Sequence, residues 1–104
     1  MNPWLAVVIA GLLETGWAIG LKYTDGFSKP IPSVLTLLGA VASFWLLSVA
    51  MRDLPVGTAY AVWVGIGAIG TTVVAVLLFN DPMNMLRAVG LMLILAGIVA
   101  LKIA

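Results

Sequence analysis

A single acidic residue, Glu14, stands in an otherwise apolar stretch of the sequence. Between Pro3 and Leu21 no other residue is charged. If this stretch forms a helix across a bilayer, at about 1.5 Å per residue, Glu14 lies near the centre of a hydrocarbon core about 30 Å thick. A carboxylate is costly at that depth, so an acidic residue there indicates a functional site.

The chemistry open to Glu14 is the exchange of a proton for a cation. No basic residue stands at its depth in the chain, so no ion pair is expected to neutralise it. A buried and unpaired carboxyl group tends to hold a proton, and it can release that proton when a cation arrives. Such competition is sufficient for exchange transport if the site faces each side of the membrane in turn.

Polar and aromatic residues in three apolar stretches are candidates to surround this acid. Trp17 shares the helical face of Glu14, one turn away. Tyr60 and Trp63 lie on one face of a later stretch, and Ser43 on a face of another. If these faces converge, their donors can orient the carboxylate, and aromatic rings suit a cation. We predict a site for substrate and proton at Glu14, Trp17, Ser43, Tyr60 and Trp63, although Ser43 can equally bond its own helix.

The composition is that of an integral membrane protein. Of the 104 residues, 63% are hydrophobic and 9% are charged, and the mean hydropathy is +1.22, whereas soluble chains carry about 25% charged residues. The chain has no cysteine and no histidine, which removes the commonest thiolate and imidazole chemistry. We therefore expect no enzyme, no metal site and no cofactor. The net charge of +1 predicts no nucleic-acid partner.

The length allows four transmembrane helices with short loops, forming a single domain over residues 1–104. Helix is the expected structure because lipid offers no partners to backbone groups. The predicted all-α transmembrane helices cover about residues 3–21, 31–51, 54–79 and 83–104. Asp53 is expected to cap the third helix, with Pro55 in its first turn, and Asn80-Asp81-Pro82 to start the fourth in the same way.

The third predicted helix is longer than the bilayer core and contains a cluster of glycines. Tilting or a kink at such a cluster would absorb the excess length, so Gly65 and Gly67 are candidates for a hinge. Simple close packing against another helix explains these glycines equally well. The sequence leaves both interpretations open.

Basic residues are almost evenly divided between the two sides of the membrane. With four spans, one side carries Lys22, Lys29 and Arg87, and the other carries Arg52 and Lys102. Orientation depends on an excess of basic residues on one side. Near balance favours the hypothesis of dual topology, in which copies insert both ways up. The alternative is a weak bias that still fixes one orientation.

Oppositely oriented copies would form an antiparallel homodimer with the inverted symmetry that larger transporters encode in one chain. Such a dimer is expected because a lone bundle of four helices leaves little room for a central cavity. In the fourth helix Gly90 and Gly97 are seven residues apart, with Ile94 beside them. A groove of small residues lets helices approach closely in lipid. These three residues predict a dimer interface, with a packing groove inside one chain as the alternative.

Several motifs together resemble the small multidrug resistance family of bacterial inner-membrane transporters. In chain order they are Ala10-Gly11-Leu12-Leu13-Glu14, Leu21-Lys22, Gly26-Phe27, Pro32-Ser33, Pro55-Val56-Gly57-Thr58-Ala59-Tyr60-Ala61-Val62-Trp63 and the glycines of the fourth helix. The resemblance covers essentially the whole chain. It implies an antiparallel homodimer that exports cations in exchange for protons, with Glu14 as the essential acid and Tyr60 and Trp63 as binding-site aromatics.

Within that family the chain is most similar to the guanidinium exporters. The similarity rests on Trp17-Ala18 after the acid and on Leu101-Lys102 at the end. It implies that Trp17, Ser43 and Trp63 hydrogen-bond the Glu14 carboxylates. Guanidinium suits such a site, because its N–H groups pair in plane with carboxylates.

The expected function is therefore proton-coupled antiport that exports guanidinium and small substituted guanidinium cations across the inner membrane. Two departures keep open the export of hydrophobic quaternary ammonium drugs. Val64 stands where a hydroxyl residue is common, and Thr15-Gly16 stands where bulkier aliphatic residues are usual. A passive channel and a structural subunit of another assembly are the remaining alternatives.

Overall fold

The structure, a computed structural model, describes residues 1–104 and consists of four α-helices. They are α1 (Pro3–Tyr23), α2 (Pro30–Ala50), α3 (Val56–Phe79) and α4 (Met85–Ile103). All four are long and apolar enough to cross a membrane. At 1.5 Å per residue α1 spans about 32 Å, which matches the thickness of a bilayer core. The predicted all-helical architecture is confirmed.

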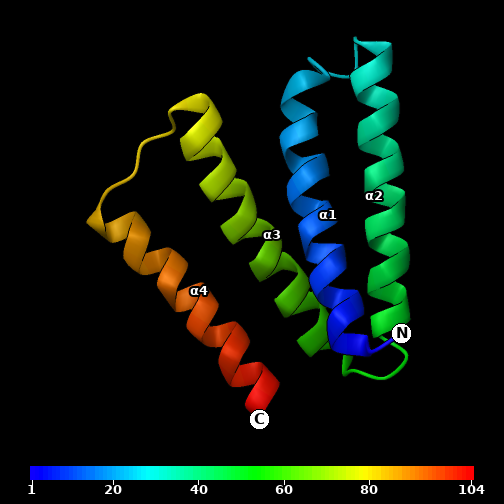
Figure 1. The fold of residues 1–104 in the computed structure, drawn as a ribbon, viewed down its shortest axis with the longest axis vertical. Helices are drawn as coiled ribbons and strands as arrows, with labels where there is room; N and C mark the ends of the chain where they lie inside the picture. The colour runs from blue at the N-terminus through cyan, green and yellow to red at the C-terminus, as the bar shows by residue number, and fades with distance from the viewer.

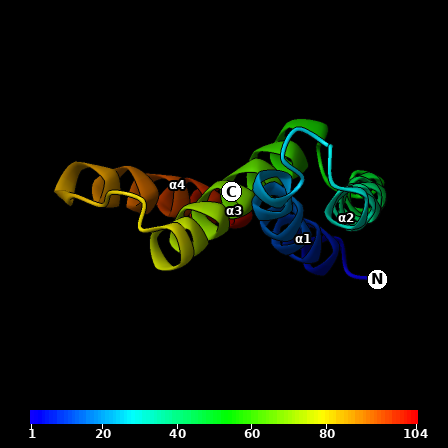
Figure 2. The ribbon, with the colours of Figure 1, turned by 90° about the horizontal axis from the view of Figure 1, so that it is seen from above.

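The helices form a flat row in the order α4, α3, α1 and α2 (Figure 1). Helix α1 packs against both α2 and α3, whereas the backbone of α4 lies close to that of α3 only. Seen from above, α4 extends away from α2 on the far side of α3 (Figure 2). No residue of α4 is buried. The first three helices are therefore a packed unit, and the fourth is attached at one edge.

The hydrophobic core lies at one end of this three-helix unit. It combines the N-terminal half of α1, the C-terminal half of α2 and the N-terminal half of α3. Its buried members are Ala6, Val7, Ala10, Leu46, Leu47, Ala50, Ala59, Val62 and Trp63. Glu14 lies one turn beyond Ala10, the last core residue of α1, so the acid sits just outside the packed core.

Glycines bring α1 close to α3. A Cβ atom added at Gly11 of α1 would lie 2.7 Å from the Cβ of Ile66 in α3. Further along, Gly70 of α3 faces the side chain of Thr15 so closely that a Cβ atom there would overlap it. Small residues of this kind allow helix backbones to approach in lipid. The contact between α1 and α3 therefore continues on both sides of Glu14.

The predicted caps of α3 and α4 are wrong. Pro55, not Asp53, is the N-cap of α3, and no side chain caps that helix. Helix α4 starts after Asn84, whose side chain accepts a hydrogen bond of 2.8 Å from the backbone N–H of Arg87. Asn80 instead ends α3 in the left-handed conformation, with φ of 54°, which suits asparagine at a helix C-terminus.

Lysine side chains lie over aromatic rings at both ends of the helices. The Nζ atom of Lys22 is 4.2 Å from the ring centroid of Phe79, and that of Lys102 is 4.6 Å from the ring centroid of Trp4. Long basic side chains and aromatic rings are typical of the two membrane interfaces. These contacts mark opposite ends of the bundle, and Glu14 lies between them.

Candidate substrate-binding site

Glu14 lines a pocket of about 320 Å³ between α1 and α3. The acid stands near the middle of α1, eleven residues after Pro3 and nine before Tyr23. The residues that line the pocket are Glu14, Trp17, Ala18, Val64, Gly67, Ala68, Thr71 and Thr72. Glu14 is the only charged residue among them. The pocket therefore offers one carboxyl group in uncharged surroundings, at mid-depth of a membrane-spanning helix.

Gly67 of α3 determines how closely the pocket wall approaches the acid. Gly67 is buried, and a Cβ atom added to it would overlap the carboxyl group of Glu14. The backbone of α3 at Gly67 therefore lies directly against the carboxyl group, with no side chain between them. Any side chain at position 67 would have to displace the group that carries the charge.

Trp17 is the one predicted polar partner that lies in the same pocket as Glu14. Its indole Nε1 is buried and has no hydrogen-bond partner in the chain. An unpaired buried donor costs free energy, because it has lost its bonds to water. Trp17 thus combines a place in the wall of the Glu14 pocket with an indole N–H that has no partner in the chain.

Ser43 and Trp63 form a hydrogen-bonded chain that ends at the backbone of α1. The Trp63 indole N–H donates to the Ser43 hydroxyl at 3.0 Å, and that hydroxyl donates to the carbonyl of Ala10 at 2.7 Å. The expected bonds from both residues to Glu14 are absent within this chain, since their donors are used one turn earlier. Ser43 also does not bond its own helix. The two side chains tie α2 and α3 to α1 beside the acid.

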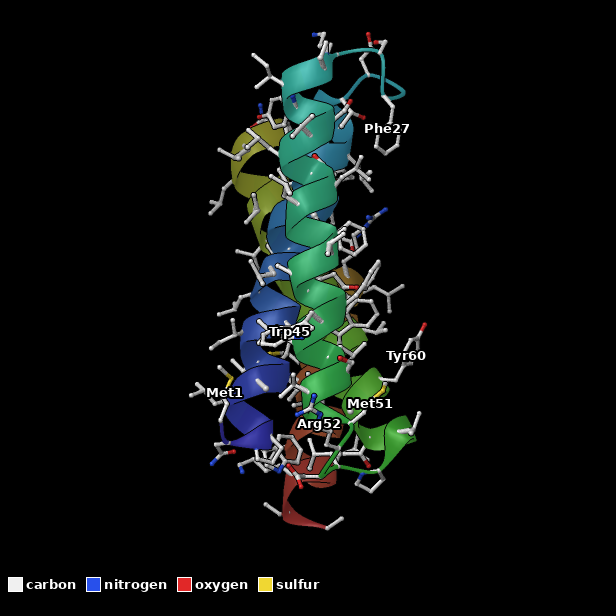
Figure 3. All side chains as sticks on the ribbon, turned by 90° about the vertical axis from the view of Figure 1, so that its right-hand side faces the viewer. Met1, Phe27, Trp45, Met51, Arg52 and Tyr60 are labelled. Atoms are coloured by element: carbon white, nitrogen blue, oxygen red, sulfur yellow. The ribbon has the colours of Figure 1, made fainter.

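Four aromatic rings from three helices continue from the pocket toward the outer face of α3. Trp17 packs against Phe44 of α2, Phe44 against Trp63, and Trp63 against Tyr60, with centroid distances of 5.9, 5.8 and 5.8 Å. Tyr60 is half-exposed and points away from the bundle (Figure 3). Of the predicted aromatics, only Trp17 therefore reaches the Glu14 pocket, and Trp63 and Tyr60 connect to it through Phe44.

Sequence reasoning missed Phe44 and Thr72, and it placed Thr71 on the same face as Trp63 and Gly67 without including it among the site residues. Phe44 directly follows Ser43, and an aromatic residue next to a buried hydroxyl was the available signal. Thr71 lies four residues after Gly67, and that spacing places both on one helical face. The signal for this pair was weak, because nothing in the sequence shows which face of α3 turns toward α1.

Gly65 and Gly67 lie at helix contacts, and α3 runs through both without interruption. Whereas Gly67 faces α1, a Cβ atom at Gly65 would lie 2.9 Å from the Cδ1 of Ile98 in α4. The two glycines therefore serve close packing on opposite sides of α3. Whether α3 also bends there stays a prediction.

The predicted interface residues of α4 are largely uncovered in the single chain. Nothing lies within 4 Å of a Cβ atom added at Gly90 or Gly97. Ile94, whose side chain reaches Gly65 of α3, is still 37% exposed. An apolar groove of about 520 Å³ between α3 and α4 includes Ile94 and Gly97. The face of α4 that carries Gly90, Ile94 and Gly97 thus has room for a further helix.

Four apolar helices and a carboxyl group in a pocket at mid-depth define a multi-pass membrane protein with an intramembrane acidic site. The family described as "Small Multidrug Resistance protein" matches residues 2–94. The chain belongs to this family, and the resemblance inferred from its motifs is confirmed.

Relatives in the family share about half of their residues with this chain. It is 54% identical over 101 residues to a protein of Yersinia pseudotuberculosis serotype I (strain IP32953) named "Guanidinium exporter", over 97% of both chains. It is 52% identical over 101 residues to the "Guanidinium exporter" of Escherichia coli (strain K12), over 97% of this chain and 96% of that protein. These names point to a transport protein rather than an enzyme.

Proposed function

We propose that this chain exports guanidinium and small substituted guanidinium ions across the inner membrane in exchange for protons. The observation that carries the proposal is Glu14, the only charged residue of its pocket, near the middle of α1. The name shared by the relatives supports the choice of cation. Guanidinium is planar, and its N–H groups match the two oxygens of a carboxylate.

One carboxyl group serves both substrate and proton in this mechanism. In a pocket with no basic side chain, a proton neutralises Glu14 when no cation is bound. An arriving guanidinium ion replaces that proton, and the proton returns when the cation leaves on the other side. Trp17 supplies its free indole N–H to the carboxylate or to the site that the cation enters.

The transporting unit is an antiparallel homodimer in this proposal. The uncovered face of α4, with Gly90, Ile94 and Gly97, supports an interface there. The division of basic residues, three on one side and two on the other, supports insertion in both orientations. Two Glu14 carboxyl groups would then lie at one depth, and where the dimer brings them close together they titrate as a coupled pair.

The remaining predicted residues have supporting roles. Ser43 and Trp63 hold α2 and α3 against α1, and thereby fix the wall behind the acid. Tyr60 extends the aromatic surface toward the outer face of α3. Gly65 and Gly67 form a hinge, because a change of access requires α3 to move against both α1 and α4, which it meets at these residues.

Transport in liposomes that contain only the purified chain tests this function. With a proton gradient, we expect uptake of guanidinium against its own gradient, faster than uptake of tetraethylammonium, and no uptake by Glu14→Gln. The apolar Val64 in the pocket wall favours the second candidate, export of hydrophobic quaternary ammonium ions. Preferred transport of tetraethylammonium would establish that candidate instead. Flux that is only downhill and independent of pH would indicate a channel.

Labelling the C-terminus tests the orientation. Under dual topology, a membrane-impermeant reagent applied to intact cells reaches a C-terminal tag on about half of the copies. If all tags lie on one side of the membrane, an antiparallel dimer of this single chain is contradicted.

A further inference from the structure

The Glu14 pocket is chemically different at its two ends. Along α3, Val64 lies about one turn before Gly67 and gives that end an apolar wall. Thr71 lies one turn after Gly67, about 6 Å along the helix axis, and Thr72 follows it. The end beyond the acid is therefore lined by two threonines, of which Thr72 also lines a second pocket against α4.

These two hydroxyls form no hydrogen bond within the chain. Hydroxyls in helices usually bond a carbonyl of the preceding turn, as Thr15 does with Gly11 at 3.3 Å. Neither Thr71 nor Thr72 makes such a bond, and both side chains are half-buried at the pocket wall. Both hydroxyls thus lack a partner within the chain, and both belong to residues that line the Glu14 pocket.

Small residues connect this end of the pocket with the acid. Gly67 and Ala68 of α3 and Ala18 of α1 line the space between Glu14 and the threonines. A cation whose charged end pairs with Glu14 can therefore extend a short substituent along α3 without meeting a large side chain. Toward the opposite end, the same substituent would meet Val64.

We infer that Thr71 and Thr72 select substituted guanidinium ions whose substituent carries a hydroxyl or amide group. This inference rests on the proposed function, in which Glu14 binds the guanidinium group. An alkyl substituent of equal length would leave both threonine hydroxyls unpaired once the pocket closes around it. A hydroxyl or amide group can pair with them, which favours polar over alkyl substituents.

A matched pair of substrates tests the inference. In liposomes of purified protein, 2-hydroxyethylguanidinium and propylguanidinium have substituents of equal length and differ in one terminal group. We expect wild-type kcat/KM to be roughly three- to tenfold higher for the hydroxyethyl ion. Thr71→Val, which keeps the shape of the side chain, should remove most of this preference, and Thr71→Val with Thr72→Val should remove all of it. Thr71→Ser should retain it.

Thr58→Val is the control, because Thr58 lies on the same helix, forms no hydrogen bond with its side chain and lines none of the pockets. Its substrate preference should match that of the wild type. Equal transport of both ions by the wild type would overturn the inference without any variant. A preference that survives in the double variant would overturn it as well. Failure of the wild type to transport unsubstituted guanidinium would instead count against the proposed function.

Discussion

Gly67 of α3 lies directly against the carboxyl group of Glu14 in α1, in the space that a side chain at position 67 would fill. This contact joins the acid to the helix that forms most of its pocket. The position of the Glu14 carboxyl group therefore depends on Gly67, which has no side chain to occupy that space.

Gly67→Ala should weaken guanidinium binding by roughly tenfold or more, because overpacking of this kind costs about 1–3 kcal/mol and falls on the carboxyl group itself. Binding is measured by calorimetry on purified protein in detergent. Gly57→Ala makes the same change on the same helix at a site with nothing within 4 Å, and it should bind as the wild type does. Equal affinity of Gly67→Ala and wild type would show that the carboxyl group does not depend on this contact.

Ser43→Ala should lower the free energy of unfolding by about 1–3 kcal/mol, since it leaves the buried Trp63 indole N–H without an acceptor. Unfolding in mixed detergent micelles gives the measurement. Ser48→Ala removes an exposed hydroxyl that bonds only its own helix, so its effect should stay within about 0.5 kcal/mol. The double variant Ser43→Ala with Trp63→Phe should lose less free energy of unfolding than the sum of the losses of the two single variants. Additive costs would contradict the direct link between these side chains.

Guanidinium binding should weaken as the pH falls. Proton and cation compete for Glu14, so lower pH favours the protonated carboxyl group and raises the apparent Kd, by about tenfold per pH unit for each competing proton once that form dominates. Addition of guanidinium to the protein in weak buffer should also release protons, which a pH electrode detects. Glu14→Gln should release none. A Kd that is independent of pH would remove Glu14 as the shared site.

Gly97→Leu should weaken dimer formation and leave the single chain folded, because nothing in the chain lies within 4 Å of that position. Single-molecule photobleaching in vesicles gives the fraction of dimers, and circular dichroism gives the helix content. Gly57→Leu, another open position, should change neither. If Gly97→Leu forms dimers as readily as the wild type, the interface does not lie on this face of α4.

Much of the secondary structure of this protein can be predicted from its sequence, because an apolar chain that spans lipid in separate stretches forms helices. Four apolar stretches predict four helices, and Glu14 is the candidate site because a charge in such a stretch indicates a functional role by default. The motifs around it also predicted the family. The caps of α3 and α4 were missed, since several polar residues in each loop are equally able to end or start a helix.

Only the tertiary structure decided which side chains meet. From the sequence, Trp17, Trp63 and Ser43 were all candidate donors to Glu14, and Ser43 could equally bond its own helix. In the structure, Ser43 and Trp63 bond each other and the backbone of α1, and Trp17 alone shares the pocket of the acid. Helical periodicity determines which residues share a face, but the rotation and height of one helix against another depend on contacts such as Gly67 against Glu14. Those contacts join residues far apart in the chain, and no local pattern encodes them.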